Sequence, residues 1–139
     1  MPARGIQHID LAVGDVAASL AFYLEVLGPL GLEERYRMPT YRGTEEVVYL
    51  EFGESAIGLR PADGGTHRYH EVGLEHLAFR VDRPDEVDAA YERCLATGAR
   101  IQSPPEFHYP DDEDYYACFA FEPDGFRIEV FAWQRDGDA

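Results

Sequence analysis

The sequence predicts an α+β domain in which one module, a strand followed by a helix and three more strands, occurs twice. A chain of 139 residues can bury roughly two thirds of its unfolded surface, which is enough for one core. When the chain is shifted by 68 residues against itself, Ile6–Val13 falls on Leu74–Val81. Both octets alternate as strands do, and each has histidine in third place, His8 and His76. A helix pattern that ends at glycine follows each octet, so the whole unit is repeated.

Each predicted helix has a recognisable start, apolar face and end. Asp15 is a suitable N-cap for the first helix, and Asp82, with Pro84 in the first turn, begins the second. The apolar faces comprise Val16, Leu20, Tyr23 and Leu27 in the first helix, and Val87, Tyr91 and Leu95 in the second. Glycines end both helices, at Gly28 and Gly31 and at Gly98.

Three strands are predicted after each helix. They cover residues 33–38, 47–52 and 56–60 in the first module, and 100–102, 115–121 and 126–131 in the second. The turns Gly53-Glu54-Ser55 and Glu122-Pro123-Asp124-Gly125 precede the last strand of each module. We place module 1 at residues 5–61, a linker at 62–72 and module 2 at 73–133, within a single domain that spans residues 1–139.

The charge of the chain restricts its partners. The 27 acidic and 12 basic residues give a formal net charge of −15. Such a surface repels the phosphates of nucleic acids and of anionic membranes, so we expect neither as a partner. All basic residues are arginine, and the absence of lysine excludes a Schiff-base nucleophile. A small molecule is the expected partner.

The cysteines and the N-terminus indicate the compartment. Cys94 and Cys118 lack any motif spacing, and buried free thiols in a reducing cytosol are the expected state. The residues after Met1–Gly5 form a short strand rather than a signal-peptide hydrophobic stretch, and no segment has the length of a membrane span. We therefore expect a cytoplasmic protein.

The repeat also predicts a metal site. Ile57-Gly58-Leu59 in the last strand of module 1 lies over Ile128-Glu129-Val130 with a shift of 71 residues. If a pseudo-two-fold axis relates the modules, equivalent positions converge on it, so His8, His76 and Glu129 meet and Gly58 leaves a fourth place empty. Two imidazoles and one carboxylate with open positions suit Fe(II), Mn(II) or, with a water ligand, Zn(II).

The residues that carry a family resemblance are Gln7-His8-Ile9, Ser19-Leu20-Ala21-Phe22-Tyr23 with Leu27-Gly28, Glu75-His76-Leu77-Ala78-Phe79, and the stretch from Glu122 to Glu129. From Ile6 to Trp133 the chain resembles the vicinal oxygen chelate superfamily, which includes glyoxalase I, bleomycin-resistance proteins, fosfomycin-resistance transferases and extradiol dioxygenases. The resemblance implies paired βαβββ modules in a half-open barrel around a divalent metal ion (Fe, Mn, Zn or Ni), with His8, His76 and Glu129 as ligands. It also implies a homodimer and a substrate that chelates the metal through adjacent oxygens.

Departures from the family pattern reduce the number of reactions that the chain is expected to catalyse. Gly58 stands where glyoxalase I has a carboxylate that is ligand and base, which argues against that isomerase. The acidic run after Pro110 and the absence of lysine argue against a phosphonate substrate. Extradiol-dioxygenase-like chemistry is therefore narrowly preferred over a lyase or isomerase, although Phe119 replaces the tyrosine usual in those enzymes. The alternative is a bleomycin-resistance-type protein that sequesters a small aromatic or cationic antibiotic without catalysis.

Two further side chains are candidate catalytic residues. Asp10 shares a strand face with His8, where it is a general base, a hydrogen-bonding partner of a ligand histidine, or a carboxylate in bulk water. Tyr115 shares a face with Phe119 and is either a phenol donor at the rim or a packing residue.

A candidate substrate-binding group lies near the end of the chain. The segment Pro104–Asp114 is predicted to be a loop, either covering the mouth of the cup or lying solvated at its side. In the first case His108 and Tyr109, together with Phe119 from the adjacent strand, bind an aromatic ligand, and the acidic end of the loop disfavours polyanions.

Overall fold

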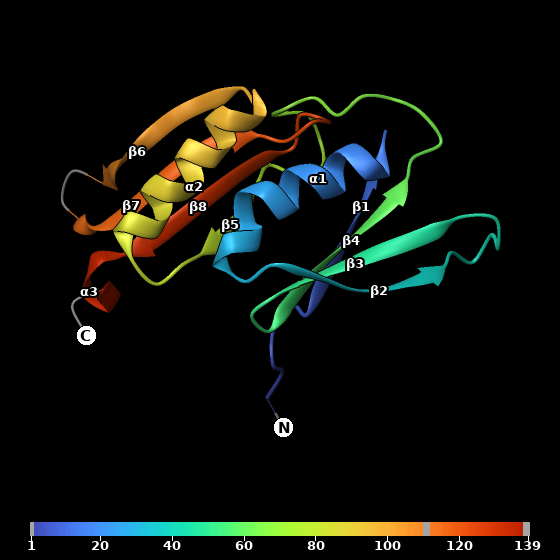
Figure 1. Cartoon of the computed structure of the whole chain (residues 1–139), viewed down its shortest axis with the longest axis horizontal. Coiled ribbons are helices and arrows are strands. Elements are labelled where there is room, and N and C mark those ends of the chain that lie inside the picture. The colour runs from blue at the N-terminus through green and yellow to red at the C-terminus, as the bar shows by residue number, and fades with distance from the viewer. Residues whose placement is uncertain (1, 110–111, 138–139) are drawn as a thin grey trace. The chain divides into compact units, whose positions relative to one another are not determined.

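The computed structural model describes residues 2–109 and 112–137, without the side chains of residues 109, 112, 113, 136 and 137. The chain divides into two compact units, Met1–Gly65 and Thr66–Ala139. Within the described residues, each unit holds one open four-stranded sheet and one helix of three turns or more (Figure 1). The predicted α+β class and the order of strand, helix and three strands in each half are confirmed.

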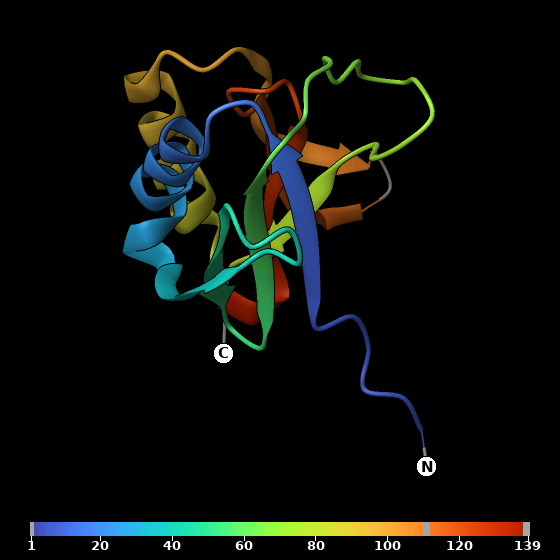
Figure 2. The same ribbon diagram turned by 90° about the vertical axis from the view of Figure 1, so that its right-hand side faces the viewer.

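The first unit contains sheet A, whose strand order is β1-β4-β3-β2. Its elements are β1 (His8–Val13), α1 (Val16–Leu27), the 3₁₀ helix η1 (Gly28–Leu30), β2 (Glu33–Pro39), β3 (Glu46–Phe52) and β4 (Ser55–Pro61). Strand β1 runs parallel to β4, and the other neighbours are antiparallel. Figure 2 shows β1, in dark blue, lying beside β4.

The second unit contains sheet B, whose order is β5-β8-β7-β6. Its elements are β5 (Leu77–Arg80), α2 (Pro84–Thr97), β6 (Ile101–Tyr109), β7 (Asp112–Phe121), β8 (Arg127–Trp133) and the short helix α3 (Gln134–Gly137). Strand β5 runs parallel to β8, and α2 packs across β6, β7 and β8 (Figure 1). No helix in the described part of the chain combines the length and the apolar character needed to cross a bilayer.

The register of the first and last strands is the same in both sheets. Asp10 of β1 pairs with Gly58 of β4, and Ala78 of β5 pairs with Glu129 of β8. These pairs correspond under the shifts of 68 and 71 residues that the sequence predicts. The repeat therefore extends from the sequence to the hydrogen-bonding pattern.

Alternation along the strands gives each sheet one face toward its helix and one open face. On β1, Leu11 and Val13 are buried, whereas His8 and Asp10 point to the opposite side. On β8, Ile128, Val130 and Ala132 are buried in the same way. His8, Asp10 and Glu129 consequently belong to the open faces.

The buried faces of the helices differ from the predicted ones. In α1 the residues that lie inside are Ser19, Phe22, Tyr23, Val26 and Leu27, and in α2 they are Val87, Ala90 and Cys94. The predictions for Val16, Leu20 and Tyr91 were wrong, since these are only half-buried, and Leu95 is 45% exposed. Small residues at Ser19, Ala90 and Cys94 allow a helix to lie close to a sheet, and a search for large apolar residues overlooks them.

The start of α2 is one residue later than predicted. The N-cap position is Arg83, not Asp82, because Pro84 occupies the first helical position and fixes the residue before it in extended geometry. Asp82 instead donates its backbone N–H to Glu86 Oε2 at 3.2 Å. The predicted N-cap Asp15 of α1 is confirmed, since it accepts a hydrogen bond from the Ala18 backbone N–H at 3.1 Å.

The predicted loop Pro104–Asp114 is wrong. Most of it belongs to β6 and β7, which pair from Ile101–Ala120 to Tyr109–Asp112. The register shifts between Ser103 and Glu106, where Pro104 and Pro105 cannot donate to the ladder. Proline is tolerated there because β6 is the edge strand of sheet B.

Both cysteines are buried and free, as predicted. Burial raises the pKa of the Cys94 thiol to about 11 and that of Cys118 to about 12. Cys94 on α2 also contributes to the raised pKa of Cys118 on β7.

The native thiols are expected to resist a thiol reagent such as DTNB. At pH 8 a thiol with a pKa of about 11 is ionised to about one part in a thousand, against roughly a quarter for an ordinary cysteine. Labelling should therefore be slow in buffer, accelerate about tenfold for each added pH unit, and go to completion at once in denaturant. Rapid labelling of the folded protein at pH 8 would contradict the burial of both thiols.

Candidate metal centre

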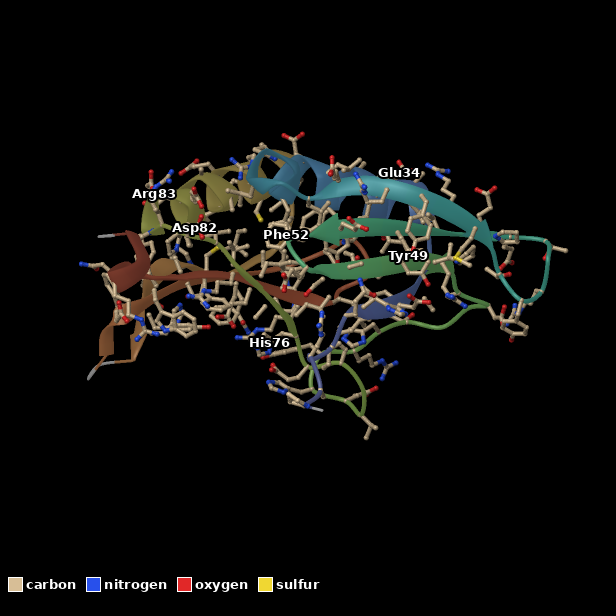
Figure 3. The ribbon with its side chains drawn as sticks, turned by 90° about the horizontal axis from the view of Figure 1, so that it is seen from below. Glu34, Tyr49, Phe52, His76, Asp82 and Arg83 are labelled. Atoms are coloured by element: carbon tan, nitrogen blue, oxygen red, sulfur yellow. The ribbon has the colours of Figure 1, made fainter. Side chains whose placement is uncertain are left out.

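The open face of sheet B brings a histidine and a buried glutamate together. His76 precedes β5 (labelled in Figure 3), and its Nε2 lies 3.1 Å from Oε1 of Glu129 on β8. The Glu129 residue is only 4% exposed. Two atoms bound to one metal ion at about 2.1 Å are separated by about 3.0–3.4 Å, so this spacing suits two ligands of one ion.

The hydrogen-bonding state of His76 favours a cation beside its Nε2. Its Nδ1 bonds to Glu75 Oε2, and because an ionised carboxylate only accepts, Nδ1 must be the protonated nitrogen. In a neutral imidazole this leaves a lone pair on Nε2 that faces the carboxylate oxygen of Glu129. Two acceptors at that distance repel each other unless a proton or a metal ion compensates them.

The orientation of Glu75 is itself fixed. Arg127 Nη1 donates to Glu75 Oε1 at 2.9 Å, and Arg127 Nε donates to Gln102 Oε1 at 2.5 Å. The hydrogen bond from His76, helped by Tyr69 and Arg127, holds the pKa of the Glu75 carboxyl below its usual range. A carboxylate that fixes the tautomer of a ligand histidine is a recurrent outer partner in metal sites.

Tyr115 contacts the candidate ligand directly. Its hydroxyl on β7 donates to Glu129 Oε2, and its ring stacks on Phe131 with centroids 4.9 Å apart. The phenol therefore holds one oxygen of Glu129 while the other faces His76. The prediction of Tyr115 as a donor is consistent with this geometry, although its partner is the glutamate.

His8, on the open face of sheet A, has a hydrogen bond at Nδ1 equivalent to that of His76. His8 Nδ1 lies 2.7 Å from Gln7 Oε1, which leaves Nε2 as the nitrogen with the lone pair. Gln7 and Glu75 occupy equivalent positions of the repeat, so each candidate histidine is oriented by the residue before it. This role was not predicted from the sequence, although the place of both residues beside the aligned histidines was the available signal.

Asp10 lies within a polar cluster on the same face of sheet A. Its Oδ2 accepts hydrogen bonds from the Tyr49 hydroxyl at 3.1 Å and from Arg60 Nη2 at 2.6 Å. Tyr49, labelled in Figure 3, is buried, and desolvation together with Asp10 raises the pKa of its phenol. Asp10 is thus held in place rather than free in bulk water, and the partner of His8 Nδ1 is Gln7 instead of Asp10. Tyr49 and Arg60 were not identified from the sequence.

Two of the predicted substrate-binding residues line the open face near His76. The Phe119 ring lies 6.0 Å from that of His76 and 5.0 Å from that of His108, and the Arg127 guanidinium lies 4.0 Å from its centroid. His108 Nε2 also bonds to the backbone carbonyl of Ala117 at 2.9 Å. The Tyr109 side chain lies outside the described residues.

The acidic end of the segment Pro104–Asp114, which was predicted to disfavour polyanions, is described with its side chain only at Asp114. Residues 110–111 and the side chains of residues 112–113 lie outside the described part of the chain. Asp114 Oδ1 accepts a hydrogen bond from the Arg135 backbone N–H at 2.7 Å, and its Oδ2 lies 3.2 Å from Arg135 Nη1. This carboxylate is therefore partly neutralised.

The described residues bring the predicted ligands together in part. Within them, no three His, Cys, Asp or Glu side chains form a complete metal site. His76 and Glu129 are a pair in one unit, and His8 belongs to the other unit. The three-ligand site remains a prediction.

Comparisons with known proteins give a family for the chain. The family model described as the Glyoxalase/Bleomycin resistance protein/Dioxygenase superfamily matches residues 5–130. A lactoylglutathione lyase of Haemophilus influenzae is 31% identical over 126 residues, covering 89% of each chain. The uncharacterized protein YqjT of Bacillus subtilis is 28% identical over 130 residues, which covers 91% of this chain and 98% of that one.

Solved structures show the same fold. A glyoxylase/bleomycin resistance protein/dioxygenase domain from Frankia has a TM-score of 0.77 at 25% identity and covers 96% of this chain and 94% of its own. The fosfomycin resistance protein FosX from Listeria monocytogenes, complexed with Mn(II) and sulfate, has a TM-score of 0.69 at 21% identity, with 94% and 93% covered. A glyoxalase I mutant from Zea mays has a TM-score of 0.73 at 21% identity, with 93% of this chain and 44% of that chain covered.

Proposed function

Since the chain belongs to the Glyoxalase/Bleomycin resistance protein/Dioxygenase superfamily, we propose that it is an enzyme that uses a divalent metal ion held by His8, His76 and Glu129. Its substrate is a small molecule that reaches the metal through two adjacent oxygens, as an α-hydroxyketone or a vicinal diol does. Bound there, the ion would supply Lewis acidity for an oxyanionic intermediate.

One observation carries the proposal. The lone pair of His76 Nε2 and a carboxylate oxygen of the buried Glu129 face each other at 3.1 Å, and Glu75 occupies the other ring nitrogen. This donor set of imidazole and carboxylate suits Fe, Mn, Zn or Ni. Gln7 bonds to Nδ1 of His8 as Glu75 bonds to Nδ1 of His76, which supports the assignment of His8 as the third ligand.

The residues around the ligands have separate tasks. Tyr115 holds Glu129 by its second oxygen, and Glu75 fixes the orientation of His76. Phe119 offers an aromatic edge next to His76, suited to the apolar part of a substrate. Arg127 carries a positive charge over the Phe119 ring, although its hydrogen bonds to Glu75 and Gln102 already engage it.

The comparisons do not favour a dioxygenase over the other branches of the family. The named relatives are a lactoylglutathione lyase, a glyoxalase I and fosfomycin resistance proteins. We therefore propose proton transfer on a chelated substrate as the first reaction to test, with oxygen consumption on catechols as the assay for the dioxygenase branch. Homodimer formation stays a prediction, which light scattering on the purified protein tests.

The experiment is metal analysis of the purified protein with matched histidine variants. The wild type should hold one divalent ion per pair of modules, and calorimetry on chelator-treated protein should give a saturable site. His8→Ala should lose that site, whereas His70→Ala, a change at an exposed histidine, should keep it.

Two results would contradict the proposal. A wild-type protein without a saturable metal site would contradict the assignment of His8, His76 and Glu129 as ligands. Tight binding of a small aromatic or cationic antibiotic by metal-free protein, unchanged in His8→Ala, would instead support a sequestering protein of the bleomycin-resistance type.

Removal of the Glu75 carboxylate should weaken metal binding without abolishing it. Outer partners of ligand histidines typically contribute about 10–100-fold to metal affinity, so Glu75→Ala should lose about that factor. Glu75→Gln keeps an acceptor oxygen for Nδ1–H and should lose less. Titration calorimetry checks both variants, and equal affinities in Glu75→Ala and the wild type would show that the contact does not orient His76.

A further inference from the structure

The first and last strands of each sheet pair at equivalent positions, and one residue of the pair is an acid. The acid lies on the first strand in sheet A but on the last strand in sheet B. Asp10 on β1 pairs with Gly58 on β4, whereas the equivalent pair in sheet B is Ala78 on β5 and Glu129 on β8. Each sheet thus has one carboxylate and one small residue at this pair. In sheet B the last strand supplies the acid, and in sheet A the first strand does.

The Asp10 carboxylate fills the space that a side chain at position 58 would occupy. A Cβ added to Gly58 would overlap Asp10 Oδ1 and would lie 2.7 Å from Tyr49 Cε1. Gly58 is not among the glycines with positive φ, so its backbone conformation does not require glycine. The neighbouring side chains require it instead.

The two oxygens of Asp10 have different surroundings. Tyr49 and Arg60 both donate to Oδ2, at 3.1 and 2.6 Å. Oδ1 is the oxygen that lies over Gly58. The cluster therefore fixes the carboxylate and directs Oδ1 to the place of the absent side chain, on the strand face that also carries His8.

We propose that Asp10 is the second carboxylate of the metal centre, supplied from β1 through Oδ1, and that Gly58 makes room for it. The inference rests on the proposed function, because it adds a residue to the same site. The roles of Tyr49 and Arg60 are to position Asp10.

The test is calorimetric titration of chelator-treated protein with Zn(II) and with Mn(II). Asp10→Ala should weaken binding by at least about tenfold, and Asp10→Asn, which keeps the shape and an acceptor for Arg60, should also weaken it. Asp63→Ala is the matched control, because Asp63 is likewise an arginine-paired carboxylate of the first unit, bonded to Arg42. It should change the affinity by less than about twofold.

A carboxylate placed on β4 instead of β1 should restore metal affinity. The double variant Asp10→Ala/Gly58→Glu removes the overlapping carboxylate and supplies a new one, so its affinity should recover most of what Asp10→Ala loses. Gly58→Ala alone should lower the melting temperature, and it should do so less in an Asp10→Ala background, because one of the two crowded contacts is gone.

The outcomes separate this inference from the proposed function. If Asp10→Ala and Asp10→Asn both bind metal as the wild type does, while His8→Ala does not, the inference is overturned and the three-ligand site stands. If the wild type binds no metal, both fail. If the double variant does not fold, Asp10→Asn decides, since a loss of affinity with an unchanged melting temperature supports a role at the metal and unchanged affinity refutes it.

Discussion

Replacement of Glu129 by alanine is expected to weaken the binding of a divalent metal by more than about 100-fold, beyond the effect of losing an outer partner. The carboxylate is buried, and one oxygen lies 3.1 Å from His76 Nε2. Its removal takes away the proposed ligand and a negative charge from a buried position. Titration calorimetry, or competition with a chelator, measures the loss.

Two companion variants separate the ligand role from the structural role of Glu129. Glu129→Gln keeps the acceptor for the Tyr115 hydroxyl but removes the charge, so it should preserve the fold and still lose most of the metal affinity. Glu106→Ala removes an exposed carboxylate of the same sheet and should leave binding unchanged. Near wild-type affinity in Glu129→Gln would show that the residue only anchors Tyr115.

The parts of the fold that the sequence predicted correctly are those fixed by local periodicity. The octets that begin each module have period-two alternation and equivalent histidines, and their strands pair in equivalent register. Gly98 ends α2 in the left-handed conformation, with φ of 79°, as expected of a glycine just beyond a helix. Such signals lie within a few residues of the structure that they specify.

The errors arose where packing or pairing partners decide the structure. Pro104 and Pro105 favour a loop in isolation, but the pairing of β6 with β7 continues around them at an edge. Leu95 is apolar and helical in its spacing, yet Cys94 is the residue that lies inside. Neither result follows from the properties of one segment alone.

The candidate site shows the same division. His8 and His76 could be selected because they occupy equivalent positions of the repeat. Glu129 could be selected because it lies in the last strand of its module, at the position equivalent to Gly58. The anchors of Asp10 could not, because Tyr49 and Arg60 lie 39 and 50 residues away and reach it only through the register of sheet A. Hydrogen bonds between strands that are far apart in the chain do not produce a recognisable pattern of spacing in the sequence.

The turn before β8 depends on Glu122, a buried acid for which no role was predicted from the sequence. Its Oε1 accepts hydrogen bonds from the backbone N–H groups of Asp124 at 2.6 Å and of Phe126 at 3.1 Å. Its own backbone joins the turn, since Gly125 N–H donates to the Glu122 carbonyl at 2.8 Å. The carboxylate thus fixes the turn from which β8 carries Arg127 and Glu129.

Glu122→Ala is therefore expected to destabilise the protein by about 2–4 kcal/mol, because it leaves two backbone donors without their charged acceptor. For a chain of this length that corresponds to a fall in melting temperature of roughly 10 °C. Glu122→Gln keeps a neutral acceptor and should cost about half as much. Glu54→Ala, in the exposed turn at the equivalent hairpin of the first module, should change the free energy of unfolding by less than about 0.5 kcal/mol. Equal melting temperatures for Glu122→Ala and Glu54→Ala would show that the carboxylate does not hold the turn.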